Sequence, residues 1–340
     1  MKRLYLVPIF LAFFTSGCTN TTKEEVKHPA HKEILPSWND SKSKADIINF
    51  VEKVTDPKKS EFVPVADRIA TFDNDGTLWT EQPFYFQFAF AVDEAKAMIT
   101  ENPEMLEDPI FNAVANDDMT TILKAGKAGL SKIIMVTHAG MTTDQYNENV
   151  TNWINTAKHP KTDKLYKEMV YQPMLELIDF LKENDFSIFI VSGGGSDFMR
   201  PWAEEVYGVS KDNIIGSTLK LEYKMEEGQP KMQILPELGF NDDEEGKPMA
   251  IHQYIGRKPI AAFGNSDGDL QMLQWTESNP YLSLQVYIHH TDADREWQYD
   301  RHSKIGQLDE GLDEALLKNW TIVDMKNDWK VIYPNDLTAE

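Results

Sequence analysis

Short apolar runs alternate with amphipathic stretches over much of the chain. Three runs of mainly apolar residues predict strands that are buried on both faces, at 68–72, 186–191 and 259–263. Helical apolar spacing lies between or after them, at 174–181, 196–207, 247–254 and 270–275. Because the buried strands alternate with helices, we expect a parallel sheet with helices on both faces, and the fold class is α/β.

Turn and capping residues define further elements. Asn39, Asp40 and Ser41 can cap a helix that ends near Val54. The three glycines at 193–195 are expected to break the strand that precedes them. A turn at 227–230 separates two strand-like segments, which predicts a hairpin, and a further strand is expected at 281–288.

The segment from 81 to 172 follows a different pattern. Alternating aromatic residues at 84–92 fit a strand, but the neighbouring alanines and the continuation through 94–97 favour a helix that is buried on most sides. More helices are expected at 110–115, 120–128 and 143–156. The sequence therefore predicts a mainly helical region between the first two buried strands.

The N-terminus has the character of an export signal. Two basic residues precede an apolar run at 4–14, which is too short to span a bilayer core of about 30 Å. The small residues before Cys18 resemble a bacterial lipoprotein processing site. This resemblance implies a signal peptide at 1–17, lipidation of Cys18 and a lipid anchor in the bacterial cell envelope, on its periplasmic or extracellular face. Residues 18–36 are polar, which predicts a tether. The alternative is a secretory signal with an incidental cysteine.

Composition narrows the possible functions. The chain has 340 residues, and 34 Lys and Arg stand against 55 Asp and Glu, for a formal net charge of −21. So acidic a surface repels phosphate backbones, and we expect no nucleic-acid binding. Cys18 is the only cysteine in the sequence, which excludes an internal disulfide framework and a zinc site built on several thiolates.

Two acidic residues follow the first buried strand. Asp73 and Asp75 are two positions apart, and Gly76 allows a tight loop after them. In open parallel sheets ligands bind beyond the carboxyl ends of the strands, so both carboxylates are expected at a ligand site. A carboxylate can attack phosphorus to form an aspartyl-phosphate, and a second acid can protonate the leaving oxygen and then activate water. The alternative is an acidic turn that caps a helix.

Three later segments complete a pattern in chain order. Ser192 and Gly193 follow the second strand, where a hydroxyl and backbone amides could hold phosphoryl oxygens. Lys247 lies on the helix before the third strand, and the run Gly-Asn-Ser-Asp-Gly-Asp at 264–269 follows that strand. Together with 72–78, these segments resemble the four motifs of the haloacid dehalogenase (HAD) superfamily, in its phosphoserine-phosphatase-like branch.

The resemblance implies a fold and an activity. The fold is a HAD-like Rossmannoid, doubly wound parallel sheet at 37–80 and 173–340, with an inserted helical cap domain at 81–172. The activity is that of a magnesium-dependent phosphomonoester hydrolase, a phosphatase, which forms an aspartyl-phosphate intermediate on a small phosphorylated substrate. Catalysis would depend on positioning and countercharge, because phosphoryl transfer concentrates negative charge on the equatorial oxygens.

The resemblance also implies roles for single residues. Asp73 would be the nucleophile and Asp75 the general acid and base. Ser192, Gly193 and Lys247 would bind the substrate phosphate, and the ammonium of Lys247 would also neutralise the nucleophile.

One position departs from the branch. Its fourth motif usually begins with Gly-Asp, and that aspartate binds magnesium, but this chain has Asn265 there. An amide oxygen can bind Mg²⁺ but brings no charge. Asp269 could bind the metal directly or orient Lys247 instead, and Asp267 is a third option. The implied metal set is Asp73, the backbone carbonyl of Asp75, Asn265 and Asp269.

Two other functions use the same residues. A phosphotransferase or phosphomutase would differ in how well the cap excludes water. A non-catalytic lipoprotein that binds phosphorylated ligands is favoured by Asn265 and disfavoured by the other motif residues.

Acidic residues and histidines also gather near 289–296 and could suggest a second metal site. His289 and His290 are followed by Asp292, Asp294 and Glu296. Consecutive histidines in a strand point to opposite faces and do not easily bind one ion. We therefore expect packing or polar contacts near the rim of the site.

Overall fold

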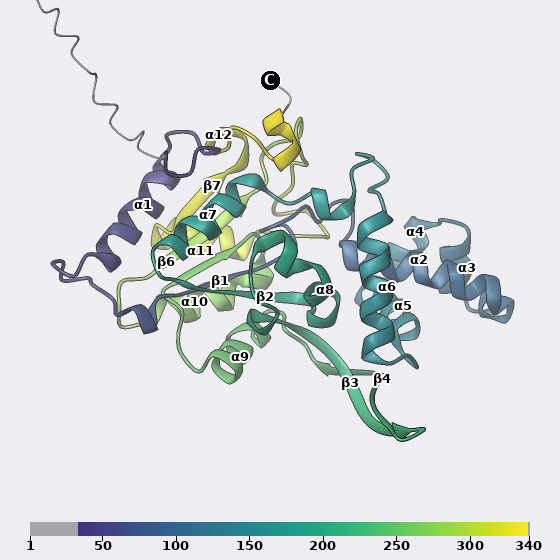
Figure 1. The fold of residues 1–340 in the computed structure, drawn as a ribbon. Coiled ribbons are helices and arrows are strands. Elements are labelled where there is room, and N and C mark those ends of the chain that lie inside the picture. The colour runs from purple at the N-terminus through teal and green to yellow at the C-terminus, as the bar shows by residue number, and fades with distance from the viewer. Residues whose placement is uncertain (1–32, 339–340) are drawn as a thin grey trace, which may run out of the picture. The chain divides into compact units, whose positions relative to one another are not determined.

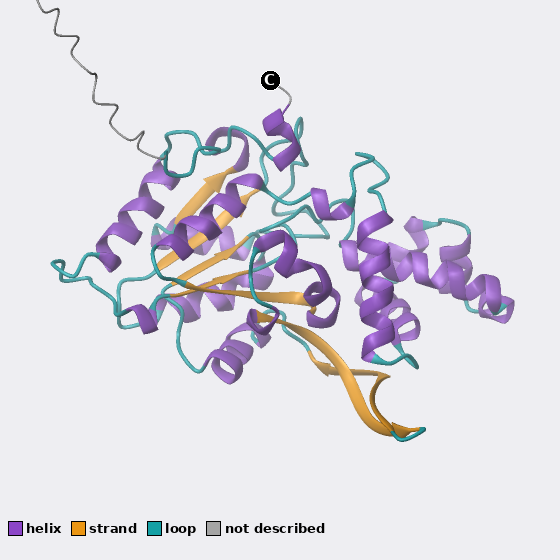
Figure 2. Cartoon of the chain, viewed as in Figure 1, coloured by secondary structure: helices purple, strands orange, loops and turns teal. Residues whose placement is uncertain are grey.

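A seven-stranded sheet forms the centre of the fold, in the order β4-β3-β2-β1-β5-β6-β7. The computed structural model describes residues 33–338, and the elements below belong to the unit formed by residues 34–340 (Figures 1 and 2). Neighbouring strands are parallel except β3 and β4, which are antiparallel. The strands are β1 Ile69–Phe72, β2 Ser187–Gly195, β3 Ile214–Glu226, β4 Gln229–Phe240, β5 Ala261–Gly264, β6 Leu284–His289 and β7 Thr321–Asp324.

Helices cover both faces of the sheet, as the alternation of elements predicts. Successive strand residues face different hydrophobic clusters: Ile190 and Ala261 pack in one cluster with α1, α7 and α8, while Val191 and Ala262 pack in another with α10 and α11. This arrangement confirms the α/β fold class. The helices are α1 Lys42–Thr55, α7 Gln172–Glu183, α8 Ser196–Tyr207, α9 Gly246–Ala250, α10 Leu270–Glu277, α11 Glu310–Lys318 and α12 Met325–Asp328.

The prediction that three glycines break the second strand is wrong. Strand β2 continues through Gly195, and its register against β3 shifts between Ser192 and Gly195. Glycine lacks a side chain and tolerates the bulged backbone that such a shift requires, so the strand bends there instead of ending.

Five α-helices lie between β1 and α7. They are α2 Phe86–Glu101, α3 Pro109–Ala115, α4 Met119–Lys124, α5 Gly126–His138 and α6 Thr143–Thr156. The helix expected at 84–97 is confirmed, whereas the single helix expected at 120–128 is two helices, because Gly126 has a φ of +62° and interrupts the first. These helices have a hydrophobic cluster of their own, which includes Phe88, Phe111 and Ile133.

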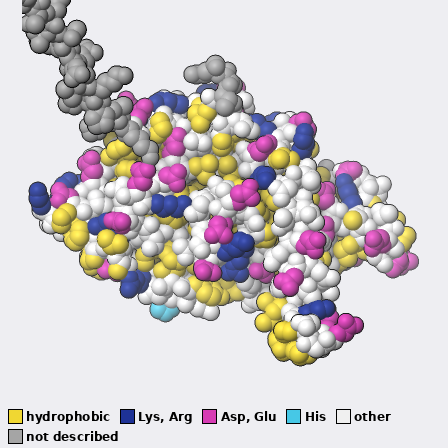
Figure 3. Space-filling model, in the orientation of Figure 1, with side chains coloured by type: hydrophobic (Ala, Val, Ile, Leu, Met, Phe, Trp, Pro, Cys, Tyr) yellow, Lys and Arg dark blue, Asp and Glu magenta, His cyan; other side chains and the backbone are white. Residues whose placement is uncertain are grey.

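The β3–β4 hairpin is longer than the sequence pattern predicts and extends beyond the rest of the sheet (Figure 1). Apolar side chains gather near its end (Figure 3), among them Tyr223, Met225 and Met232, each of them exposed. The hairpin also contacts the loop between α5 and α6, because the N–H of Gly140 donates to the carbonyl of Ile234 at 2.9 Å. The inserted helices and the sheet therefore meet along this hairpin.

The predicted signal peptide, Cys18 and most of the predicted tether lie outside the described residues. Leu35 is already buried in the hydrophobic core, so the packed part of the chain begins just before Pro36. None of the helices in residues 33–338 has the length and apolar character needed to cross a bilayer.

Candidate active site

The carboxyl ends of three adjacent strands bring the predicted motif residues together. Asp73 follows β1, Gly193 and Gly194 lie in the last part of β2, and Asn265 follows β5. The backbone N–H of Asp73 donates to the carbonyl of Phe263 at 2.9 Å, so the β1 and β5 loops start in register. A cavity of about 220 Å³ opens at this edge, and its lining includes Asp73, Asp75, Glu81, Gly193, Gly194, Asp243, Lys247, Ser266 and Asp269.

Lys247 connects two of these loops. Its Nζ lies 2.6 Å from Oδ1 of Asp73 and 2.8 Å from Oδ1 of Asp269, and it donates to the carbonyl of Val191 at 2.8 Å. Burial alone would lower the pKa of Lys247, but Asp269 and Asp73 outweigh it and raise the pKa. The lysine therefore remains charged and provides a positive charge beside both carboxylates.

Both oxygens of Asp269 are engaged by protein groups. Oδ1 faces Lys247, while Oδ2 accepts from the backbone N–H groups of Asn265 at 2.9 Å and Ser266 at 3.0 Å. These contacts favour the orienting role for Asp269 over direct metal ligation, two options that the sequence left open. The third option, Asp267, accepts from the backbone N–H groups of Asp309 and Gly311 and thus holds the start of α11.

The two motif aspartates have different surroundings. Burial and the neighbouring Asp269 raise the pKa of Asp73 well above its usual value, against the pull of Lys247. Asp75 accepts from the indole N–H of Trp79 at 2.8 Å, and burial raises the pKa of this carboxyl to about 6 despite that hydrogen bond. A carboxyl with such a pKa can exchange a proton near neutral pH, as a general acid and base must.

Ser192 supports the glycine loop and is not part of the cavity lining. Its side chain is fully buried, and its Oγ accepts from the N–H of Gly194 at 3.0 Å. A Cβ placed on Gly194 would lie 3.3 Å from both Oδ2 of Asp75 and Oγ of Ser192, so the three groups are close together. Glycine here allows the backbone to approach the carboxylate of Asp75, and it is Gly193 and Gly194 that line the cavity.

Glu81 is a buried carboxylate at the same site that none of the sequence patterns indicates. Its Oε1 accepts from Nδ2 of Asn265 at 2.7 Å and from the hydroxyl of Tyr299 at 2.8 Å. Burial raises the pKa of Glu81 well above its usual value, and the charges of Asp75 and Asp73 add to this effect. Glu81 belongs to none of the four motifs, and a glutamate in a loop after a strand gives no signal of burial in the sequence alone.

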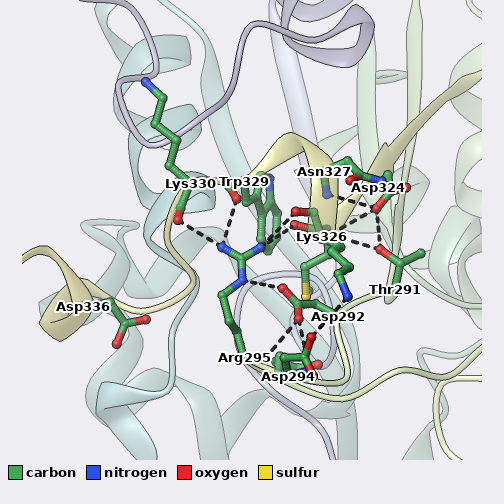
Figure 4. Close-up of polar contacts among 12 residues, drawn as sticks. Thr291, Asp292, Asp294, Arg295, Asp324, Lys326, Asn327, Trp329, Lys330 and Asp336 are labelled. Carbon is green, nitrogen blue, oxygen red and sulfur yellow. Dashed lines mark hydrogen bonds and ion pairs between the residues drawn. The ribbon is translucent and has the colours of Figure 1, made fainter.

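The acidic and histidine residues near 289–296 form structural contacts, as expected. Asp292 is paired with Arg295, whose guanidinium also donates to the carbonyls of Met325, Lys326, Trp329 and Lys330 (Figure 4). His290 contacts Oε2 of Glu296 through Nδ1 at 3.2 Å and the carbonyl of Gly76 through Nε2 at 2.8 Å. These contacts attach the C-terminal segment and the loop after β6 to the loop that carries Asp75.

A second cavity, of about 360 Å³, adjoins the first. Gln87, Ile134, Gly193 and Asn241 line both of them. The side-chain amide oxygen of Gln87 accepts from the N–H of Gly195 at 2.7 Å, which connects α2 to the end of β2. The inserted helices therefore contribute to the wall of the site as well as covering it.

The predicted metal ligands differ in their access to the cavity. Asp73, Asp75 and Asp269 line it, and oxygen ligands of this kind are those that magnesium accepts. Asn265 is buried and does not line the cavity, and its Oδ1 accepts from the hydroxyl of Thr77 at 3.2 Å. Within residues 33–338 no three His, Cys, Asp or Glu side chains converge as a complete metal site. Lys247 supplies the one ammonium group in this cavity lining, beside the carboxylates of Asp73, Asp75, Glu81 and Asp269. This excess of negative charge favours a divalent cation.

The solved structures that match this chain include three with sequence identities below 20%. A protein of unknown function from Bordetella pertussis Tohama I is 14% identical, with a TM-score of 0.49, over 76% of this chain and 98% of that one. A phosphoserine phosphohydrolase-like protein from Francisella tularensis subsp. tularensis SCHU S4 is 19% identical, with a TM-score of 0.36, over 65% and 87%. A probable phosphoserine phosphatase from Vibrio cholerae is 13% identical, with a TM-score of 0.36, over 68% and 58%.

None of the curated proteins with which the chain was compared matches it. The family model of haloacid dehalogenase-like hydrolases matches residues 70–274, a range that contains the loops after β1, β2 and β5 together with Lys247. The match covers more than half of the chain and coincides with the cluster of buried carboxylates around one lysine. The protein therefore belongs to the haloacid dehalogenase-like hydrolase family.

Proposed function

We propose that the protein is a magnesium-dependent phosphatase that hydrolyses small phosphomonoesters through an aspartyl-phosphate. The observation that supports this most strongly is the position of Lys247, with Nζ 2.6 Å from Asp73 and 2.8 Å from Asp269 in a cavity open to a ligand. The ammonium offsets the repulsion between a buried carboxylate nucleophile and an anionic phosphate.

In the first half of the reaction, a carboxylate oxygen of Asp73 attacks phosphorus, and the bond from phosphorus to the ester oxygen breaks. Asp75 gives its proton to that oxygen, so the product leaves as an alcohol. In the second half, Asp75 takes a proton from water, and the water oxygen attacks phosphorus and releases Asp73 and inorganic phosphate. The backbone N–H of Gly193, which lines the cavity, would bind a phosphoryl oxygen, while Oγ of Ser192 accepts from the N–H of Gly194 and so fixes the glycine loop.

Magnesium, when bound, would neutralise negative charge on the phosphoryl oxygens. Asp73, the carbonyl of Asp75 and Asn265 would hold it. Asp269 acts as a positioning residue for Lys247, because its two oxygens are engaged by that lysine and by backbone N–H groups.

The test is hydrolysis of a chromogenic aryl phosphate by the chain without residues 1–17, the predicted signal peptide, with Mg²⁺ and then with EDTA. We expect release of phosphate that EDTA abolishes and that Asp73→Asn lowers by several orders of magnitude. Asp117→Asn, at an exposed carboxylate on the inserted helices, is the matched control and should keep its activity. Turnover that survives both EDTA and Asp73→Asn would contradict the proposal. Addition of an acceptor alcohol distinguishes hydrolysis from transfer, since a transferase would yield a phosphorylated acceptor.

We also propose that the enzyme acts outside the cytoplasm and is attached to the membrane by a lipid anchor at Cys18. The basic, apolar and small-residue order at 1–18 supports this location. Metabolic labelling with a palmitate analogue in a bacterial host should label the full-length chain and leave Cys18→Ala unlabelled. Equal labelling of both forms would refute the anchor.

A further inference from the structure

The second cavity is lined mainly by apolar side chains. Ile134 and Met135 come from α5, Phe198 from α8, and Leu219, Ile234 and Leu238 from the β3–β4 hairpin. Its volume of about 360 Å³ falls within the range of ordinary ligand pockets, roughly 300–1,000 Å³. Gln87 and Gly193 line both cavities. When the phosphate of an ester binds in the first cavity, its leaving group can therefore extend into the second.

His138 places a hydrogen-bond acceptor in this apolar wall. The hydroxyl of Thr137 donates to the carbonyl of Ile133 at 2.9 Å, as threonines inside helices commonly do, and it lies 2.9 Å from Nδ1 of His138. We therefore assign the ring proton of His138 to Nδ1. Burial lowers the pKa of His138 to about 3, which leaves the ring neutral. Its Nε2 is therefore an unprotonated acceptor, and it is buried without a partner.

Two more polar side chains line this cavity, those of Tyr146 and Asp197. The ring of Tyr146 lies 4.6 Å from that of His138 between centroids, and its hydroxyl, like Nε2 of His138, is buried without a hydrogen-bond partner. Asp197 is paired with Arg200 at 3.4 Å. Buried polar atoms are normally paired, so Nε2 of His138 and the hydroxyl of Tyr146 point to a polar group on a ligand.

We propose that the natural substrate is a phosphomonoester whose leaving group has an uncharged apolar body, of ring size, and carries a hydroxyl or amine donor at its far end. The apolar body would fill the space between α5 and the hairpin, and the donor would pair with Nε2 of His138. This inference rests on the proposed phosphatase activity. Phosphoserine fits poorly, because its carboxylate would enter the cavity that Asp197 shares with apolar side chains.

The test compares kcat/KM for phenyl phosphate, 4-hydroxyphenyl phosphate and phosphoserine. We expect phenyl phosphate to exceed phosphoserine by about tenfold or more, and the 4-hydroxy ester to exceed phenyl phosphate. In His138→Phe, which keeps an aromatic ring but lacks the acceptor, the ratio of the two aryl esters should fall to about one. Tyr254→Phe, at an exposed position on the helix after Lys247, is the control and should keep the wild-type ratio.

The ratios are measured within one preparation, so a partly unfolded variant does not distort them. Phosphoserine turned over as well as phenyl phosphate would overturn the proposal, and so would a hydroxyl preference that His138→Phe retains. Absence of hydrolysis for all three esters would instead contradict the phosphatase activity itself.

In the fourth motif Asn265 replaces the usual aspartate, and the contacts of its amide carry a second inference. Asn265 donates from Nδ2 to Glu81 at 2.7 Å, and its Oδ1 accepts from the hydroxyl of Thr77 at 3.2 Å. The opposite amide orientation would place Oδ1 against the carboxylate of Glu81, which disfavours it. Glu81 is itself 1% exposed and held by Tyr299, so the orientation of the amide is fixed.

The geometry points to Glu81 as a positioning residue for the proposed metal site. It fixes the orientation of the Asn265 amide, and its own carboxylate lines the cavity beside the position where an aspartate would have carried the negative charge. Partners of metal ligands commonly change affinity by about 10–100-fold when they are removed. The inference rests on magnesium binding as proposed above.

Calorimetric titration of the EDTA-treated protein with Mg²⁺ tests this without any substrate. We expect Glu81→Gln, which keeps an acceptor but removes the charge, to weaken Mg²⁺ binding about tenfold or more. The double variant Glu81→Gln with Asn265→Asp should recover most of that loss, because the aspartate restores the carboxylate. Glu61→Gln, in the loop after α1, is the control.

Unchanged Mg²⁺ affinity in Glu81→Gln would overturn the role of Glu81, and so would a double variant that binds no better than the single one. Lack of Mg²⁺ binding by the wild-type protein would contradict the cofactor assignment instead. The two failures are therefore distinguishable.

Discussion

Replacement of Lys247 by methionine tests the electrostatic arrangement of the site through stability. The side chain of Lys247 is 2% exposed, and those of Asp73 and Asp269 are 9% and 1% exposed. Methionine fills a similar volume, so little of the effect comes from a cavity. The variant leaves two buried carboxylates next to each other without their shared cation.

Breaking a buried ion pair by removing one partner costs about 3–5 kcal/mol. At about 2–4 °C per kcal/mol, as for domains of 150–250 residues, the melting temperature should fall by about 6–20 °C. Thermal unfolding in EDTA measures this for the chain without residues 1–17. Lys42→Met, at a lysine whose side chain is 85% exposed, is the control and should change the melting temperature little.

A second substitution separates charge from packing. In Lys247→Met with Asp269→Asn, one of the two unpaired carboxylates is neutral, so part of the lost stability should return. A loss below about 1 kcal/mol in Lys247→Met, which is the range of exposed pairs, would refute the reasoning. A double variant less stable than Lys247→Met would refute it as well.

Three further predictions concern pH, the C-terminal segment and the glycine loop. Burial raises the pKa of Asp242 to about 7, although the positive charge of Lys247 acts to lower it. Because this folded pKa exceeds the unfolded value, ionisation of Asp242 destabilises the fold as the pH rises towards 7 and above. Asp242→Asn should therefore melt higher than wild type at pH 8 and match it near pH 4. Arg295→Met should lower the free energy of unfolding in urea by about 2–4 kcal/mol, because Asp292 and four carbonyls lose their donor; a loss below 1 kcal/mol would contradict this. Ser192→Ala should lower kcat about tenfold or more, since Gly194 loses its acceptor, and an unchanged kcat would contradict that role.

The order of the motifs was sufficient to predict the general arrangement of the site. Parallel strands end at one edge of the sheet, so residues after β1, β2 and β5 meet there whatever the detailed packing. Lys247 has an ordinary helical context in the sequence, and only its position before a buried strand distinguished it from surface lysines. Its contacts with Asp73 and Asp269 come from the structure.

Other features depend on packing that sequence patterns do not encode. Glu81 lies in an irregular segment, and its burial results from contacts with Asn265 and Tyr299, which are far away in the sequence. Glycines usually end strands, but those at 193–195 stay in β2 because they bulge against β3. The acceptor on His138 follows from the hydrogen bonds of Thr137, which a helical pattern cannot show.

The central claim is that Asp73 becomes phosphorylated during turnover. The most direct measurement is to mix the enzyme with an aryl phosphate and Mg²⁺, quench within the first turnover, reduce with borohydride and identify peptides by mass spectrometry. An aspartyl-phosphate is reduced to homoserine, so we expect homoserine at position 73 and unmodified Asp75 in the same peptide. Hydrolysis of the ester during that turnover with Asp73 unmodified would contradict the account.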